Sequence, residues 1–189
     1  MSVTQWVIEM YTKEEQDLNL ESAKNFSFVW SLFEHMSKGA IFQGDNLPAS
    51  EFLAWINSLQ IQYENGNLTI INTEARKDIS GDLVSNIYKS FNHFYQKYEN
   101  DSEGFIELLY AQSITPVIKE KERFIAFMQV CDKSKMQDKI YFLFFIAKRM
   151  RNKFFHGIKS IGEVSRDHKE FERISEYLIS IISLFEDYH

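Results

Sequence analysis

Residues that interrupt regular secondary structure are scarce in this chain, which has 7 glycines and 2 prolines among 189 residues. Glycine and proline supply most turns and chain breaks, so their scarcity argues against a many-stranded all-β fold and favours long, uninterrupted elements. The 17 phenylalanines provide large apolar side chains that can fill a core between such elements. We therefore predict an all-α helical bundle of about five to seven helices.

Apolar residues recur every three or four positions along most of the chain, which is the spacing that places them on one face of a helix. The predicted helices cover approximately residues 22–36, 48–59, 83–98, 105–111, 117–130, 137–155 and 167–188. Thr115 before Pro116 predicts an N-cap and a first helical position. Gly157 predicts the end of the sixth helix, because glycine is common just after the last helical residue.

One segment has the pattern of a β-hairpin. Polar and apolar residues alternate on both sides of Asn65-Gly66, and this dipeptide is the strongest short-range signal for a two-residue hairpin turn. We expect a small hairpin near residues 61–70 that lies on the helices, because an isolated pair of strands is only marginally stable.

The length of the chain suits one domain, 1–189, in which the largely polar residues 1–20 form an N-terminal arm. The N-terminus lacks the basic and then apolar pattern of a signal peptide. The longest apolar run, 141–147, is too short to cross a membrane. The single cysteine, Cys131, cannot form an internal disulfide, which fits a reducing compartment. We expect a soluble cytoplasmic protein with no membrane partner.

Charge is distributed unevenly along the chain. The net charge of −6 argues against non-specific binding to nucleic acid. Residues 139–162, however, contain no Asp or Glu and form a basic segment, whose cations are Lys139, Lys148, Arg149, Arg151, Lys153 and Lys159. This segment is where an anionic partner would bind.

The basic segment contains Arg151-Asn152 followed, after three residues, by His156-Gly157. Histidine titrates near neutrality and can move a proton at an attacking or leaving oxygen. Arginine can hold phosphate oxygens as negative charge develops on them. Asn152 could orient either group through a hydrogen bond. These residue types suit cleavage of an RNA phosphodiester by its own 2′-hydroxyl. The sequence contains no metal-binding motif, and we expect no metal and no cofactor.

This motif resembles the signature of HEPN domains, an arginine followed after four to six residues by a histidine, commonly with a polar residue next to the arginine. The form here, Arg-Asn-Lys-Phe-Phe-His-Gly, is most similar to the Apea-like branch of that superfamily. An early helix with Trp30, Phe33 and Glu34 is weakly similar to that branch as well.

The resemblance implies a homodimer in which two Arg–His pairs face one cleft, and a metal-independent endoribonuclease that acts as a toxin or an antiviral-defence effector. An antitoxin or regulatory protein would then be a partner. Arg151, Asn152 and His156 would be the catalytic residues, and the RNA backbone would be guided by Arg149, Lys153 and Lys159.

Other interpretations stay open at this point. Cations gather at helix C-termini because they complement the dipole and the free carbonyls there. Arg151 and His156 are also about 140° apart around an intact helix, so they converge only if the helix ends near His156 or if a partner chain supplies one of them. Glu34 could fix the tautomer of His156, or form a salt bridge elsewhere.

Two alternative functions follow from the acidic remainder of the chain. The domain could be a catalytically inactive HEPN-like module that binds or regulates another protein. It could also be an immunity or antitoxin-like protein whose acidic face meets a basic partner.

Overall fold

The structure is a computed structural model. It describes residues 5, 19–38, 41–44, 47–64, 67–71, 76–79, 81–111, 115–156 and 161–185. The predicted N-terminal arm lies almost entirely outside the described residues, and so do Gly157 and Lys159.

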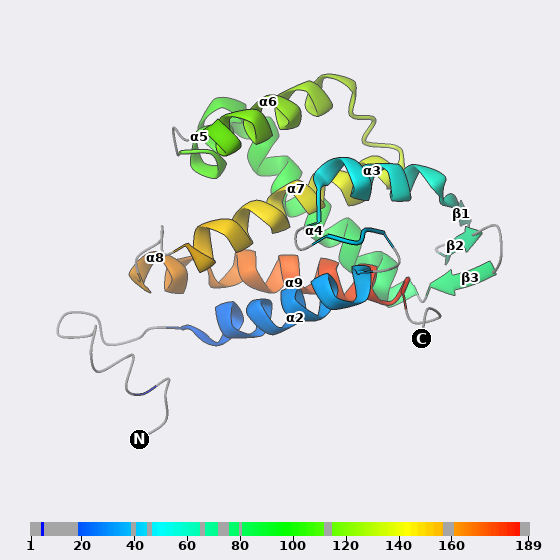
Figure 1. The fold of residues 1–189 in the computed structure, drawn as a ribbon, viewed down its shortest axis with the longest axis horizontal. Helices are drawn as coiled ribbons and strands as arrows, with labels where there is room; N and C mark the ends of the chain where they lie inside the picture. Colours follow the sequence, from blue (N-terminus) through cyan, green and yellow to red (C-terminus); the bar gives the residue numbers. More distant parts are fainter. Residues whose placement is uncertain are drawn as a thin grey trace.

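The described residues form a mostly helical fold with one small sheet (Figure 1), which confirms the predicted all-α class. The elements are α2 (Glu21–Ser37), α3 (Ala49–Ser58), β1 (Gln60–Glu64), β2 (Asn67–Ile71), β3 (Arg76–Ile79), α4 (Gly81–Asn100), α5 (Ser102–Leu109), α6 (Thr115–Val130), α7 (Met136–Phe155), α8 (Ile161–Arg166) and α9 (His168–Ile182). All seven helices expected from the periodicity are present, and the short α8 is an addition to them.

Helix α9 lies between α2 and α4 and packs along both, and α7 crosses this layer in contact with α3, α4, α5 and α9. α2 is held against α9 by its apolar stripe, in which the ring of Phe26 packs at a tilt against that of Phe171, with ring centroids 5.2 Å apart. The side-chain hydroxyl of Ser22 also donates to Glu172 at 3.0 Å. The first and last long helices of the described chain are therefore neighbours.

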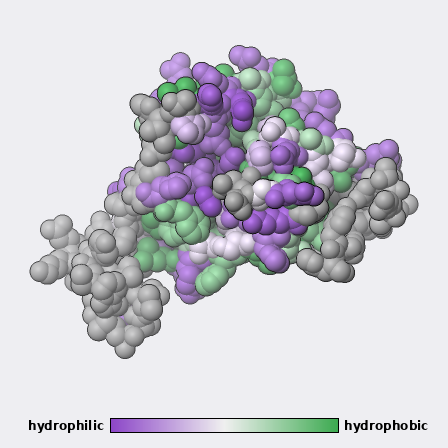
Figure 2. Space-filling model, in the orientation of Figure 1, coloured by the Kyte–Doolittle hydropathy of each residue, from purple (hydrophilic) through white to green (hydrophobic). Residues whose placement is uncertain are grey.

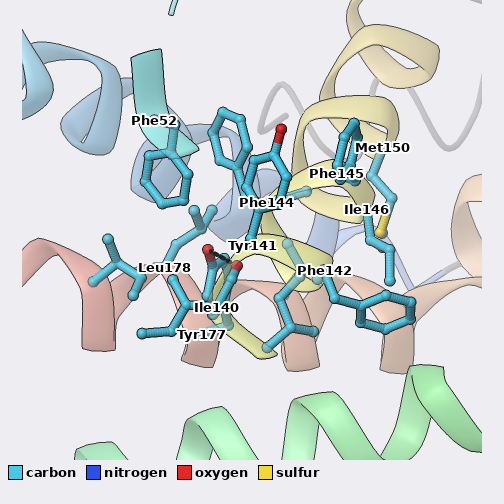
Figure 3. Close-up of a cluster of buried hydrophobic side chains, with 14 of the residues drawn as sticks. Phe52, Ile140, Tyr141, Phe142, Phe144, Phe145, Ile146, Met150, Tyr177 and Leu178 are labelled. Carbon is cyan, nitrogen blue, oxygen red and sulfur yellow. Dashed lines mark hydrogen bonds between the residues drawn. The ribbon is translucent and has the colours of Figure 1, made fainter. Parts of the chain in front are cut away.

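Helix α7 is the centre of the core, because every residue from Met136 to Ala147 except Gln137 and Asp138 is buried. Successive phenylalanines of α7 meet different neighbours, as expected for a helix that is enclosed on all sides. Phe144 stacks on Phe52 of α3 at 4.0 Å, and Phe142 meets Phe91 of α4 edge to face. Figure 3 shows this cluster, with the hydroxyl of Tyr177 donating to the carbonyl of Ile140 at 2.9 Å.

The predicted hairpin is present and has gained a third strand. β1 and β2 pair in antiparallel fashion with Gln62 opposite Thr69. β3 pairs with the other edge of β2, with Leu68 opposite Ile79, and this strand was not predicted. The sheet contacts α4 through β2, in line with the expectation that a hairpin needs helices beneath it.

Hydrophilic residues cover most of the middle of the face drawn in Figure 2, and hydrophobic residues appear mainly near its edges. No helix among the described residues is both long enough and apolar enough to cross a lipid bilayer.

Candidate functional site

Two cations of the basic segment serve a structural purpose that the sequence did not reveal. Arg149 is 1% exposed, and its Nε donates to the carbonyl oxygen of Leu109 at 2.6 Å. Lys153 is 8% exposed, and its Nζ donates to the carbonyl oxygen of Leu108 at 2.7 Å. Leu108 and Leu109 are the last two residues of α5, whose final carbonyls have no partner within their own helix. The two cations therefore cap α5 from α7.

Burial has an electrostatic cost for both cations. Desolvation lowers the pKa of Arg149, and the charge of Glu120 and the phenol of Tyr110 act in the opposite direction. The Arg149 guanidinium also lies over the ring of Tyr110, 5.6 Å from its centroid. Desolvation likewise lowers the pKa of Lys153, and the neighbouring charge of Arg149 lowers it further. Their burial leaves Arg149 and Lys153 little side-chain surface for the predicted contact with an RNA backbone.

Arg151 lies on a different side of α7 and has a different environment. Its Nη2 is 3.6 Å from Oε1 of Glu34 on α2, and each side chain is 25% exposed. Its Nη1 donates to Oδ1 of Asn152 at 3.2 Å, and its guanidinium lies 5.4 Å from the ring centroid of Phe155. Its Nε is buried and has no hydrogen-bond partner among the described residues. Arg151 is thus fixed in place but still reachable by a ligand.

His156 is exposed and forms the C-cap of α7. Its backbone N–H donates to the carbonyl oxygen of Asn152 at 3.1 Å, so the helix is intact up to this point. The rotation of about 140° between Arg151 and His156 is therefore kept. Asn152 contacts both residues, through its side chain to Arg151 and through its backbone to His156. Lys159 cannot be placed, because it lies outside the described residues.

Of the two roles predicted for Glu34, the fixing of the His156 tautomer or a salt bridge, the structure shows a salt bridge, with Arg151. This ion pair has two effects. It sets the direction of the guanidinium, and it offsets the positive charge that the basic segment presents to solvent. Glu34 directly follows the buried Phe33 on α2, and the sequence around Glu34 does not indicate which residue its carboxylate contacts.

Within one chain, the end of α7 carries the fixed guanidinium of Arg151 and the exposed imidazole of His156 on different sides of the helix. A second copy of the chain could place its own arginine opposite this histidine. Among the described residues, no group of three or more His, Cys, Asp or Glu side chains is arranged to hold a metal ion.

Comparison of the chain with protein-family models, with characterised proteins and with solved structures finds no match. The resemblance to HEPN domains therefore rests on the motif around Arg151 and His156 and on the helical context in which it lies.

Proposed function

We propose that this protein is a metal-independent endoribonuclease of the HEPN type that works as a homodimer in the cytoplasm. The observation that supports this function most is the arrangement at the end of α7. Arg151 is held by Glu34 and Asn152 while a quarter of its side chain stays exposed, and His156 is exposed one turn further along. Most of α7 between Met136 and Met150 is buried in the core, so both residues follow a firmly packed stretch of helix.

In the proposed reaction, the 2′-hydroxyl of a ribose attacks the adjacent phosphorus and the 5′-oxygen of the next nucleotide leaves. His156 moves the proton at one of these two oxygens, which fits its exposed position. Arg151 stabilises the extra negative charge on the phosphoryl oxygens in the transition state. Asn152 and Glu34 act as positioning residues for Arg151. The products are a 2′,3′-cyclic phosphate and a 5′-hydroxyl.

The dimer belongs to the proposal because of the helix geometry. An intact helix separates Arg151 from His156 by about 140°, so the arginine that faces a given histidine comes most simply from a second copy. Phe155 is 49% exposed at the same end of α7 and offers apolar surface for such a contact. A role as a toxin or antiviral effector, with an antitoxin or regulatory protein as partner, is part of the same proposal and rests on the resemblance to HEPN domains.

The test is cleavage of total RNA in EDTA by the wild-type protein and by His156→Ala, with analysis of the end groups. We expect the wild type to cleave and the variant to lose about 100-fold to 10,000-fold in rate, as is typical when a general acid or base is removed. His35→Ala, which alters another exposed histidine, should keep full activity. Equal cleavage by wild type and His156→Ala would assign the activity to another site or to a contaminant.

A second candidate function, a catalytically inactive module that binds another protein, is favoured by one observation. Arg149 and Lys153 are buried and Arg151 faces Glu34, so the basic segment presents less free positive charge than its composition suggests. Such a module should show no RNA binding between about 50 and 200 mM salt, whereas phosphate contacts would give an affinity that falls steeply over that range. Fluorescence anisotropy with a labelled RNA distinguishes the two functions.

A further inference from the structure

A cavity of about 170 Å³ lies beside α7, where residues of α4, α5 and α9 also form its walls. Its apolar walls include Phe94, Phe105, Ile146 and Met150, and Lys153 is among its polar lining residues. Lys153 follows Arg151 by two positions, about 200° around the helix, so the cavity is on the other side of α7 from Glu34. The cavity is therefore separate from the site at Arg151 and His156.

Lys153 gives the cavity wall a positive charge that has no close counter-ion among the residues that the structure describes. Its ammonium is buried, and its hydrogen bond goes to a neutral carbonyl, that of Leu108. Within the described part of the chain, Lys153 makes no ion pair with a carboxylate, although the charge of Glu163 acts to raise its pKa. Arg149, a second buried cation, acts on it unfavourably. A buried cation in this situation is costly unless an anion joins it.

The two acidic residues of the lining are already engaged. Glu170 forms an ion pair with Lys97 and also lies 3.7 Å from Nε2 of His93. Asp167 has an interaction of its own and sits at the N-terminus of α9, where the helix dipole favours negative charge. Lys153 is thus the polar group of this cavity with the most to gain from a ligand.

We propose that the cavity binds a small monocarboxylate whose apolar part is a single ring or a short branched chain. The carboxylate pairs with Lys153, and the apolar part packs between Phe94, Phe105 and Met150. The volume suits this class, since a cavity of ~150 Å³ in another protein holds one benzene ring. The ligand enters the cavity from the side on which Leu108, which is 68% exposed, and Lys97 lie. The site does not depend on the proposed nuclease activity.

The experiment uses the full chain and two probes of equal shape, benzoate and the neutral benzamide. Benzoate is expected to shift the methyl resonances of Met150 and Ile146, and to bind at least about tenfold more tightly than benzamide, because only benzoate forms a charge-assisted contact with Lys153. The preference for benzoate should disappear in Lys153→Met, which keeps the length of the side chain.

The comparison of the two probes on the wild-type protein stands even if Lys153→Met does not fold. 3-Methylbutanoate serves as the branched-chain probe in the same titration. Equal affinity for benzoate and benzamide would overturn the proposal, and so would shifts confined to methyl groups away from the cavity. If neither carboxylate binds at a concentration of ~10 mM, the proposal is overturned as well, because a site shaped for this ligand class should bind it more tightly than that.

Discussion

Replacing Arg149 with alanine is expected to lower the free energy of unfolding by about 3 kcal/mol or more. Among the described residues, Arg149 has the largest fully buried side chain, so its truncation leaves a large cavity next to Tyr110. It also removes the donor to the carbonyl of Leu109. Relief of the repulsion with Lys153 offsets only part of this loss, because a cavity and an unsatisfied carbonyl remain. Urea denaturation followed by circular dichroism measures the change.

Arg151→Ala is the matched control, since it makes the same substitution two residues further along the same helix. Its side chain is a quarter exposed, and its ion pair with Glu34 is of the kind that contributes about 0–1 kcal/mol. The control should therefore stay within about 1 kcal/mol of wild type. If Arg149→Ala is equally mild, the capping of α5 contributes little to stability and its structural assignment is wrong.

Phe144→Ala is expected to cost about 3–5 kcal/mol, the range for removing a large aromatic side chain from a core. Phe144 is 0% exposed on the central helix, stacks on Phe52 at 4.0 Å and lies 6.2 Å from the ring of Phe33. Its loss therefore removes contacts between α7 and both α2 and α3. The midpoint of urea denaturation should fall sharply.

The matched control is Phe28→Ala on α2, where the same side chain is 68% exposed. We expect a change within about 0.5 kcal/mol, because an exposed phenylalanine loses little buried area on truncation. Comparable losses for the two variants would mean that Phe28 is covered in solution, for example by a second copy of the chain.

The helices could be predicted because their pattern is local. The central helix was expected over 137–155 and covers Met136–Phe155, since its apolar residues and its neighbours carry the signal themselves. β3 was missed for the opposite reason. Its sequence, Arg76 to Ile79, has one apolar residue and no alternation, and its strand conformation comes from backbone pairing with β2.

The candidate site was predictable only in part. The motif and the end of the helix near His156 could be predicted, because both depend on residues that are consecutive in the sequence. The burial of Arg149 and Lys153 is not, because it depends on the carbonyls of Leu108 and Leu109 at the end of a helix far earlier in the chain. The contact between Glu34 and Arg151 joins α2 to α7 in the same non-local way. Cations clustered in a sequence can therefore be divided between structural and solvent-facing roles only once the fold is known.

The packing of α2 against α9 has a consequence for the order of events during protein synthesis. Phe26, Trp30 and Phe33 leave the ribosome long before two of the rings they pack against, because Phe171 and Phe185 are translated near the end of the described chain. Closing so long a loop costs entropy that only the finished contact offsets. Until α9 emerges, the nascent chain exposes an aromatic stripe on α2, which is the type of segment that chaperones shield.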